Sequence, residues 1–168
     1  LHRLFLHHLG ASPSAVAQTR RLHFAKQLIS DTDLPMFRVA QASGFRSVRR
    51  FNDAIRALYG KTPSDLRRLR PVSSRARPDE YVFRLAYRPP YDWDAMLGHL
   101  SARAMPGVEH VDGERYLRTV VENGEDGTVE VAHVPERRAH AVTIRFPNVR
   151  ALPAIVGRVK RLFDVGAD

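Results

Sequence analysis

The sequence predicts a two-domain α+β protein, with an all-helical domain followed by an antiparallel sheet that carries two helices on one face. Apolar residues recur at helical intervals up to residue 70, whereas period-2 alternation begins only after residue 79. Charge divides the chain at the same place, because residues 1–70 hold 13 Lys and Arg against 4 Asp and Glu, and residues 71–168 hold 14 of each. We therefore expect domains at residues 1–70 and 79–168, joined by a Pro-, Ser- and Arg-rich linker at residues 71–78.

The first helices are predicted from their caps and apolar stripes. Residues 1–9 have a helical apolar pattern with no capping residue before it, so we expect the sequence to begin within an element. Ser12 and Pro13 then supply an N-cap and an N1 proline for a helix that runs to about Ile29. A polar loop is expected at residues 30–33, before the next helix.

The central feature of the helical domain is a helix-turn-helix pattern over residues 35–68. Gly44 ends a short apolar segment, and glycine accepts the positive φ of a tight turn. Ser47 then caps a second helix, whose inward face is expected to hold Phe51, Ile55 and Leu58. Gly60 closes this helix, and residues 62–65 begin a short one with a capping box and an N1 proline. The candidates for DNA contact lie around the start of the second helix: Arg46, Ser47, Val48, Arg49, Arg50 and Asp53.

The second domain is predicted from alternation and turn residues. A strand over residues 81–87 has one apolar face, made by Tyr81, Phe83, Leu85 and Tyr87. Asp92 is expected to cap a helix whose buried stripe holds Trp93, Met96, Leu97, Leu100 and Ala104. Further strands are expected at residues 108–111, 116–121, 128–134 and 140–146, with turns at Gly113 and from Asn123-Gly124 to Gly127. A last helix is expected at residues 149–163, with an apolar side of Leu152, Ile155, Val156, Val159, Leu162 and Phe163.

The composition excludes several classes of site. There is no cysteine for a disulfide or a thiolate metal site, and the eight histidines form no HExxH spacing. A GxGxxG motif and a P-loop are also absent, so we expect no cofactor and no metal. Because no run approaches 18 apolar residues and no signal peptide is recognisable, we expect a cytoplasmic protein with no membrane partner.

The helix-turn-helix residues resemble a known family. The matching residues are Val39-Ala40, Gly44-Phe45-Arg46-Ser47, Phe51, Gly60-Lys61-Thr62-Pro63 and Arg67. Their spacing resembles the second helix-turn-helix of the AraC family of bacterial regulators. This resemblance implies sequence-specific binding of double-stranded DNA and regulation of transcription, with RNA polymerase as a further partner.

The same resemblance extends to the start of the chain. LHRLFLHHLG resembles the end of the recognition helix of the first helix-turn-helix unit, so that this unit would be truncated. His2 and Arg3 then match positions that contact bases or backbone. Arg20 and Arg21 match an arginine pair of the connecting helix, and we expect them to brace the two units rather than to hold phosphate.

The second half resembles the N-terminal domain of the AlkA-type DNA glycosylases, which excise alkylated bases and whose N-terminal domain resembles the TATA-binding protein. The matching residues are Pro89-Pro90-Tyr91-Asp92-Trp93, Met96-Leu97, Leu100, Ala102-Arg103-Ala104, Glu109, Tyr116, Arg118 and Leu162-Phe163-Asp164. In that family the catalytic helix-hairpin-helix domain follows the N-terminal domain. No residue of this chain is a candidate catalytic group, and we expect the chain as given to have no glycosylase activity.

Together the two halves resemble bifunctional proteins of the Ada/AlkA kind, which join a regulator of the alkylation response to a repair glycosylase. Such proteins often begin with a four-cysteine zinc domain, which this sequence lacks. One alternative makes the second half a small-molecule sensor with a pocket lined by Tyr81, Phe83, Tyr87 and Trp93. Another makes it an inert spacer. A core filled by these aromatic side chains would favour the accessory glycosylase domain over the sensor.

Overall fold

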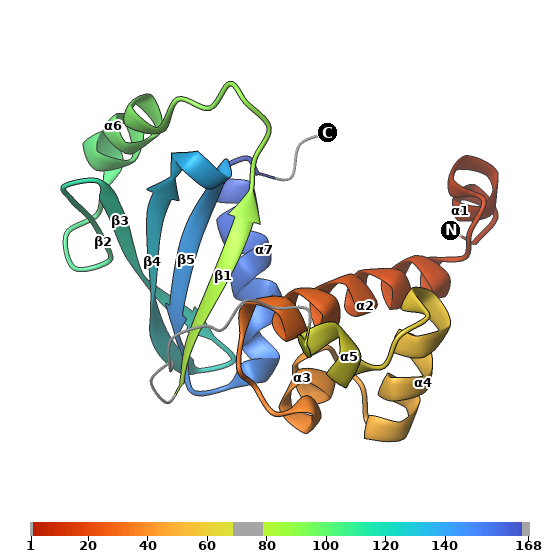
Figure 1. Cartoon of the computed structure of the whole chain (residues 1–168). Coiled ribbons are helices and arrows are strands. Elements are labelled where there is room, and N and C mark those ends of the chain that lie inside the picture. Colours follow the sequence, from red (N-terminus) through yellow and green to blue (C-terminus); the bar gives the residue numbers. More distant parts are fainter. Residues whose placement is uncertain (1, 69–78, 166–168) are drawn as a thin grey trace. The chain divides into compact units, whose positions relative to one another are not determined.

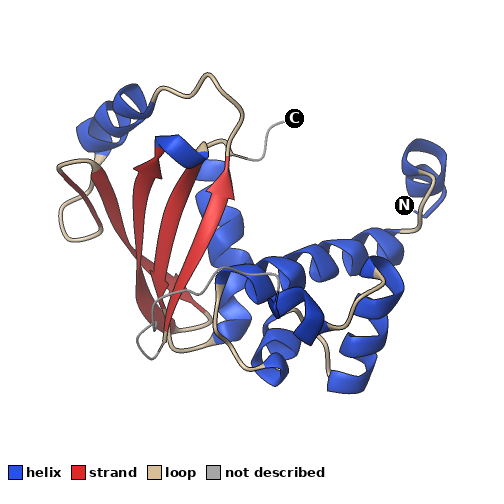
Figure 2. Cartoon of the chain, in the orientation of Figure 1, coloured by secondary structure: helices blue, strands red, loops and turns tan. Residues whose placement is uncertain are grey.

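The structure is a computed structural model that describes residues 2–68 and 79–165, so the linker predicted at residues 71–78 lies outside the described residues. Seven α-helices and five strands are described (Figures 1 and 2). They fall into two units, of which the first contains the helices α1 to α5 and the second contains the elements from β1 to α7. The predicted α+β fold class is confirmed.

The first unit consists of the helices α1 (His2–Leu9), α2 (Pro13–Asp31), α3 (Met36–Ala42), α4 (Val48–Tyr59) and α5 (Pro63–Arg68). The predicted cap at Ser12 is confirmed, because its Oγ accepts from the amide of Ala15 at 3.2 Å. The predicted end of α2 was too early, since the helix continues to Asp31 and takes two residues from the expected polar loop. The capping box at the start of α5 is confirmed, because Thr62 and Asp65 each accept from the other's amide.

The core of the first unit is made by α2, α3 and α4. Its buried side chains include Leu22, Ala25, Leu28, Ile29, Val39, Ala40, Phe51 and Ile55. The prediction that Leu58 faces inward was wrong, because this side chain is 44% exposed. At this end of α4 the next residue, Tyr59, makes the contact with α2 through His23. Leu58 lies about 100° away from it around the helix and is left in solvent.

The second unit is a five-stranded antiparallel sheet with two helices. Its strands are β1 (Glu80–Ala86), β2 (Glu109–Asp112), β3 (Arg115–Glu122), β4 (Glu125–Val134) and β5 (Ala139–Arg145), in the order β1-β5-β4-β3-β2. Its helices are α6 (Trp93–Arg103) and α7 (Leu152–Leu162), and α7 follows a 3-10 turn at Val149–Ala151. Another 3-10 turn at Pro135–Arg137, which the sequence did not predict, joins β4 to β5.

One predicted turn is shorter than expected. Asn123 and Gly124 both have positive φ and form a two-residue hairpin between β3 and β4, so that β4 begins at Glu125 rather than at Thr128. Gly127 is therefore a strand residue and not part of the turn. A Cβ added there would lie 2.3 Å from the carbonyl oxygen of Arg145 and 2.6 Å from the ring of Phe146. Glycine is needed at this position because backbone and ring approach it closely.

The core of the second unit lies between one face of the sheet and the helices. The sheet contributes buried side chains that alternate along each strand, among them Tyr81, Phe83, Leu85, Tyr116, Val129, Val131, Val142 and Ile144. From α6 come Trp93, Leu97 and Leu100, and from α7 come Leu152, Ile155, Val156 and Val159. In Figure 1, α7 runs behind the sheet and α6 lies at one end of it. The predicted cap of α6 is confirmed, since Asp92 accepts from the Ala95 amide at 2.9 Å.

Candidate DNA-binding site

The turn between α3 and α4 is held by backbone hydrogen bonds and by a small aromatic contact. Gly44 has a φ of +77°, and its amide donates to the carbonyl of Gln41. The next amide, that of Phe45, donates to Ala40, and the Phe45 ring packs edge-on against Phe51 at 5.5 Å. The two helices are thereby fixed at the turn, which sets the direction in which α4 projects.

The start of α4 presents basic side chains to solvent. Arg46 precedes the helix, while Arg49 and Arg50 lie in its first turn, and all three are exposed. Among the described residues of either unit, none of these three forms an ion pair. Because Phe51 and Ile55 are buried, the opposite face of α4 carries Arg49, Asp53 and Arg56. The structure therefore places the predicted contact residues Arg46, Val48, Arg49, Arg50 and Asp53 on exposed positions of one helix and the turn before it.

Ser47 has a structural role in addition to the predicted contact. Its Oγ accepts from the amide of Arg50 at 3.4 Å and so caps α4, as the sequence predicted. A hydroxyl that accepts in this way keeps its own hydrogen for donation to a phosphate oxygen. His2 and Arg3 lie in the first turn of α1, where Arg3 is exposed.

The sequence did not predict how the far end of α4 is anchored. The hydroxyl of Tyr59 lies 3.2 Å from Nδ1 of His23, and Nζ of Lys26 lies 4.9 Å from the centre of the Tyr59 ring. Both partners belong to α2, and burial raises the pKa of the Tyr59 hydroxyl. The sequence does contain one sign of this anchor, because the aromatic residue Tyr59 directly precedes Gly60, which ends α4. These contacts fix the orientation of α4 against the long helix.

Two of the arginines that match the family, Arg21 and Arg67, lie against other parts of the helical unit. The side chain of Arg21 lies close to the turn, since a Cβ added to Gly44 would be 3.5 Å from its Nε, and the bracing role expected of this residue remains a prediction. Arg67 donates from Nη2 to the carbonyl of Leu34 at 2.6 Å and so ties α5 to the segment before α3. Arg20 is exposed on α2.

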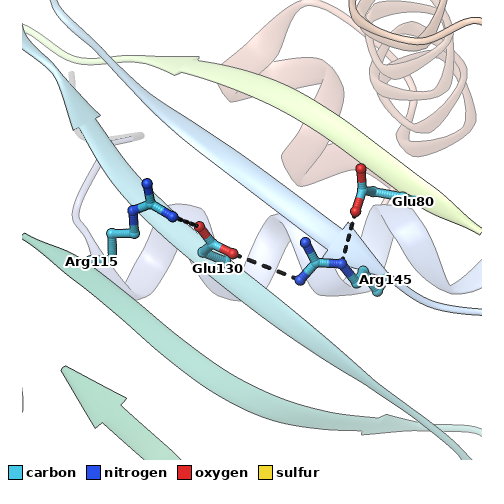
Figure 3. Close-up of polar contacts among 4 residues, drawn as sticks. All are labelled: Glu80, Arg115, Glu130 and Arg145. Carbon is cyan, nitrogen blue, oxygen red and sulfur yellow. Dashed lines mark hydrogen bonds and ion pairs between the residues drawn. The ribbon is translucent and has the colours of Figure 1, made fainter. Parts of the chain in front are cut away.

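Unlike the arginines of α4, Arg115 and Arg145 on the open face of the sheet are paired with carboxylates. Figure 3 shows these pairs. Arg115 on β3 contacts Glu130 on β4 at 2.9 Å, and the other oxygen of Glu130 lies 3.7 Å from Arg145 on β5. Arg145 in turn contacts Glu80 on β1 at 2.8 Å. We call this row of Arg115, Glu130, Arg145 and Glu80 the charge ladder. Its two cations are matched by two carboxylates, so the charge ladder has no net positive charge to attract phosphate.

A groove of about 820 Å³ lies beside the start of α6. Its lining includes Tyr87, Tyr91, Met96 and Asp164. Of the four aromatic residues expected to line a sensor pocket, only Tyr87 lies at this groove, whereas Tyr81, Phe83 and Trp93 are buried in the core. Burial, and then the nearby charge of Asp164, raise the pKa of Tyr91 to about 12, and its hydroxyl donates to the carbonyl of Phe163 at 2.9 Å.

Beneath these tyrosines lies a pair of histidines that are partners across β4 and β5. The Tyr87 hydroxyl lies 2.7 Å from Nε2 of His133, and His140 is fully buried against the rings of Tyr91 and Trp93. Burial, and then the neighbouring His133, lower the pKa of His140 to about 4. A histidine with so low a pKa is neutral near pH 7, so it adds no positive charge to this unit.

The described residues contain neither a cluster of metal-ligating side chains nor a helix suited to span a membrane. Over residues 2–68 and 79–165, no three His, Asp or Glu side chains are grouped so that they could hold a metal ion. Within the same ranges, no helix combines the length and the apolar character required to cross a bilayer.

Two known protein families match this chain, one in its first part and one in its second part. Residues 82–168 match the family described as the AlkA N-terminal domain. Residues 1–69 match the family described as a helix-turn-helix domain. Both resemblances inferred from the sequence are confirmed.

Individual relatives match either one half of this chain or both halves. A protein of Mycobacterium tuberculosis, named a probable bifunctional transcriptional activator/DNA repair enzyme AlkA, is 35% identical over the whole of this chain, which spans 34% of the relative's length. DNA-3-methyladenine glycosylase 2 of Escherichia coli is 33% identical over 50% of this chain and 30% of its own. The probable transcriptional regulator LumQ of Photobacterium leiognathi is 40% identical over 38% of this chain and 25% of its own. The chain thus spans about a third of the M. tuberculosis relative.

Proposed function

The chain belongs to the family of the AlkA N-terminal domain, and from this membership and its helix-turn-helix half we propose a DNA-binding regulator of the alkylation-damage response, joined to the non-catalytic accessory domain of an alkylbase DNA glycosylase. The M. tuberculosis relative that matches the whole chain has a name that joins transcriptional activation to DNA repair.

The observation that carries the proposal is the exposed basic end of α4. A recognition helix contacts base edges in the major groove through residues near its N-terminus, and here that end carries Arg49 and Arg50 beside Arg46. Arg49 or Arg50 would bind guanine O6 and N7 through its guanidinium, and Asp53 would accept from a cytosine amine. The remaining contacts are assigned to His2, Arg3, Ser47 and Val48.

The accessory role of the second unit is supported by its core and by its charge. Three of the four aromatic residues expected of a sensor pocket are buried between sheet and helices. The charge ladder is neutral, and residues 71–168 as a whole hold 14 Lys and Arg against 14 Asp and Glu. We therefore assign the DNA affinity to residues 1–70 and the accessory domain to residues 79–168, with the linker at residues 71–78.

We also propose the binding partners of this chain and its place in the cell. Double-stranded DNA is the partner of the helical unit, and RNA polymerase is proposed as a second partner because the matching M. tuberculosis relative is named a transcriptional activator. A regulator of this kind acts in the cytoplasm, where bacterial DNA lies.

The test is a binding-site selection with the full chain, followed by substitution of one arginine. The selected duplex should bind more tightly than random duplex, and Arg49→Ala should weaken binding to the selected duplex by about 1–3 kcal/mol, which is the usual worth of a bidentate base contact. Binding to random duplex should change much less. Fluorescence anisotropy at one fixed salt concentration measures both.

The matched control is Arg103→Ala, which removes the same charge from an exposed position on α6. This variant should bind both duplexes as the unaltered chain does. Equal weakening of both duplexes by Arg49→Ala would limit this residue to phosphate contact. A selection that yields no preferred sequence would contradict the proposed function.

A further inference from the structure

A basic hollow lies where α4 meets α5, away from the proposed base contacts. It has a volume of about 450 Å³, and its lining is Arg56, Gly60, Lys61, Thr62, Asp65 and Arg68. The cations come from three places, namely the outward face of α4, the loop after it and the end of α5. We call this feature the α4–α5 hollow. Nothing in the proposed base contacts uses it.

The charges of the α4–α5 hollow favour an anion. The one carboxylate, that of Asp65, accepts from the amide and the hydroxyl of Thr62, and these hydrogen bonds together with Arg68 and Lys61 lower its pKa. Arg68 lies 3.6 Å from this carboxylate and so offsets its charge. Within the part of the chain that the structure describes, neither Arg56 nor Lys61 has an ion-pair partner. Two positive charges therefore remain at the hollow.

The position of the hollow relative to Arg49 indicates which anion it would meet. Arg56 is seven residues after Arg49 on the same outward face of α4, which corresponds to about 10 Å along the helix axis. The major groove is about 12 Å wide and is bordered by phosphates. When Arg49 contacts a base edge, the C-terminal end of α4 therefore lies close to a wall of the groove.

We propose that the α4–α5 hollow binds one phosphate of the DNA backbone through Arg56 and Lys61. This inference rests on the proposed function, because it takes the start of α4 to lie in the major groove. The contact fixes the depth and register of α4 on the duplex, and it carries no sequence information of its own. Both side chains are exposed, so they can be replaced with little effect on folding.

The first experiment measures the salt dependence of binding by the full chain. Each phosphate contact contributes about 0.9 to the slope of log K against log salt. The double variant Arg56→Gln/Lys61→Gln should lose about one such unit on both the selected and a random duplex. Between 50 and 200 mM salt the unaltered chain should then lose about 3-fold more affinity than the variant. The control Arg137→Gln/Arg150→Gln, which removes two exposed arginines of the second unit, should keep the full slope.

The second experiment locates the contact on the duplex. Single phosphates of the selected site are replaced one at a time by neutral methylphosphonates. At one position the replacement should weaken the unaltered chain about as much as the double variant is weakened, and it should have no further effect on the double variant. Such a result identifies one phosphate as the partner of the hollow.

Three results would overturn the inference: an unchanged slope in the double variant, a loss confined to the selected duplex, or additive effects at every methylphosphonate position. A circular dichroism melting curve that matches the unaltered chain verifies that the double variant is folded. Failure of the proposed function is distinguishable, because it appears as the absence of any preferred sequence in the unaltered chain.

Discussion

The arginines of α4 and the arginines on the open face of the sheet occupy different electrostatic environments. Arg46, Arg49, Arg50 and Arg56 stand exposed in the helical unit, and none of them has an ion-pair partner in the described part of the chain. On the open face of the sheet, Arg115 and Arg145 are paired with Glu130 and Glu80. The two halves have nearly the same number of Lys and Arg, 13 and 14. Residues 1–70 hold only 4 Asp and Glu, however, whereas residues 71–168 hold 14, so only the helical half has a net positive charge. We expect the affinity for DNA to follow this net charge and not the number of arginines.

The largest effects are expected from two core substitutions, one in each unit. Phe51→Ala and Trp93→Ala each remove a large buried ring, and each should destabilise its own unit by about 3–5 kcal/mol. Phe51→Ala should abolish DNA binding, because α4 loses its support. Trp93→Ala should unfold the sheet unit and leave most of the DNA affinity in place. Circular dichroism and duplex retention on the same samples measure both effects.

The substitution Leu58→Ala is the control for the helical unit, since it truncates an exposed side chain on the same helix as Phe51. It should change neither the melting curve nor the affinity by a comparable amount. Loss of DNA binding in Trp93→Ala would show that the sheet unit is needed for DNA contact.

The next largest effect is the pH dependence of the free energy of unfolding of the sheet unit. The pKa of His140 is about 4 in the folded unit, whereas an unfolded histidine has a pKa of about 6.5. Between these values the unfolded chain binds more protons, so the free energy of unfolding should fall as the pH is lowered from 6.5 to 4. The loss is on the order of 3 kcal/mol. The groups that face His140 are the rings of His133, Tyr87, Tyr91, Trp93 and Phe163.

Thermal unfolding followed by the fluorescence of Trp93, the one tryptophan of the chain, reports on this unit alone. The variant His140→Leu keeps the site apolar and should flatten the profile between pH 6.5 and 4. If the variant and the unaltered chain lose stability in parallel over this range, the pH dependence has another source.

The smallest effect is expected at the charge ladder. Glu130→Gln removes the carboxylate that pairs with Arg115 and also weakens the electrostatic attraction to Arg145. Because these pairs are partly exposed, stability should fall by no more than about 1 kcal/mol. Retention on random duplex should rise slightly, since the charge ladder gains a net positive charge. Arg103→Gln, which removes a cation elsewhere in the unit, should not raise it.

Local features were the most predictable from the sequence. The caps at Ser12, Ser47 and Asp92 follow from a side-chain oxygen placed before an apolar period, and each is confirmed by its hydrogen bond. The closing Gly60 and the Asn123-Gly124 hairpin follow from positive φ. These rules act within four or five residues, so a single sequence contains all the information that they need.

Features that depend on tertiary contacts were not predictable. The exposure of Leu58 depends on how α2 passes the end of α4, and the place of Gly127 in β4 depends on Phe146, which is 19 positions away in sequence. The charge ladder requires the register of four strands, because Arg115 and Glu130 come together only across β3 and β4. The predicted contact residues around Ser47 lie at exposed positions at the start of α4 and in the turn before it, and their contacts with DNA remain predictions.

The assignment of DNA affinity to the helical unit is tested most directly by neutralising the same number of charges in each unit of the full chain. The variant Arg46→Gln/Arg49→Gln/Arg50→Gln is compared with Arg103→Gln/Arg137→Gln/Arg150→Gln, and the salt dependence of duplex binding is measured for both. All six side chains are exposed. We predict that the first variant loses about two units of slope and most of its affinity, and that the second binds as the unaltered chain does. Equal losses in the two variants would contradict the assignment, because they would place phosphate contacts on the sheet unit as well.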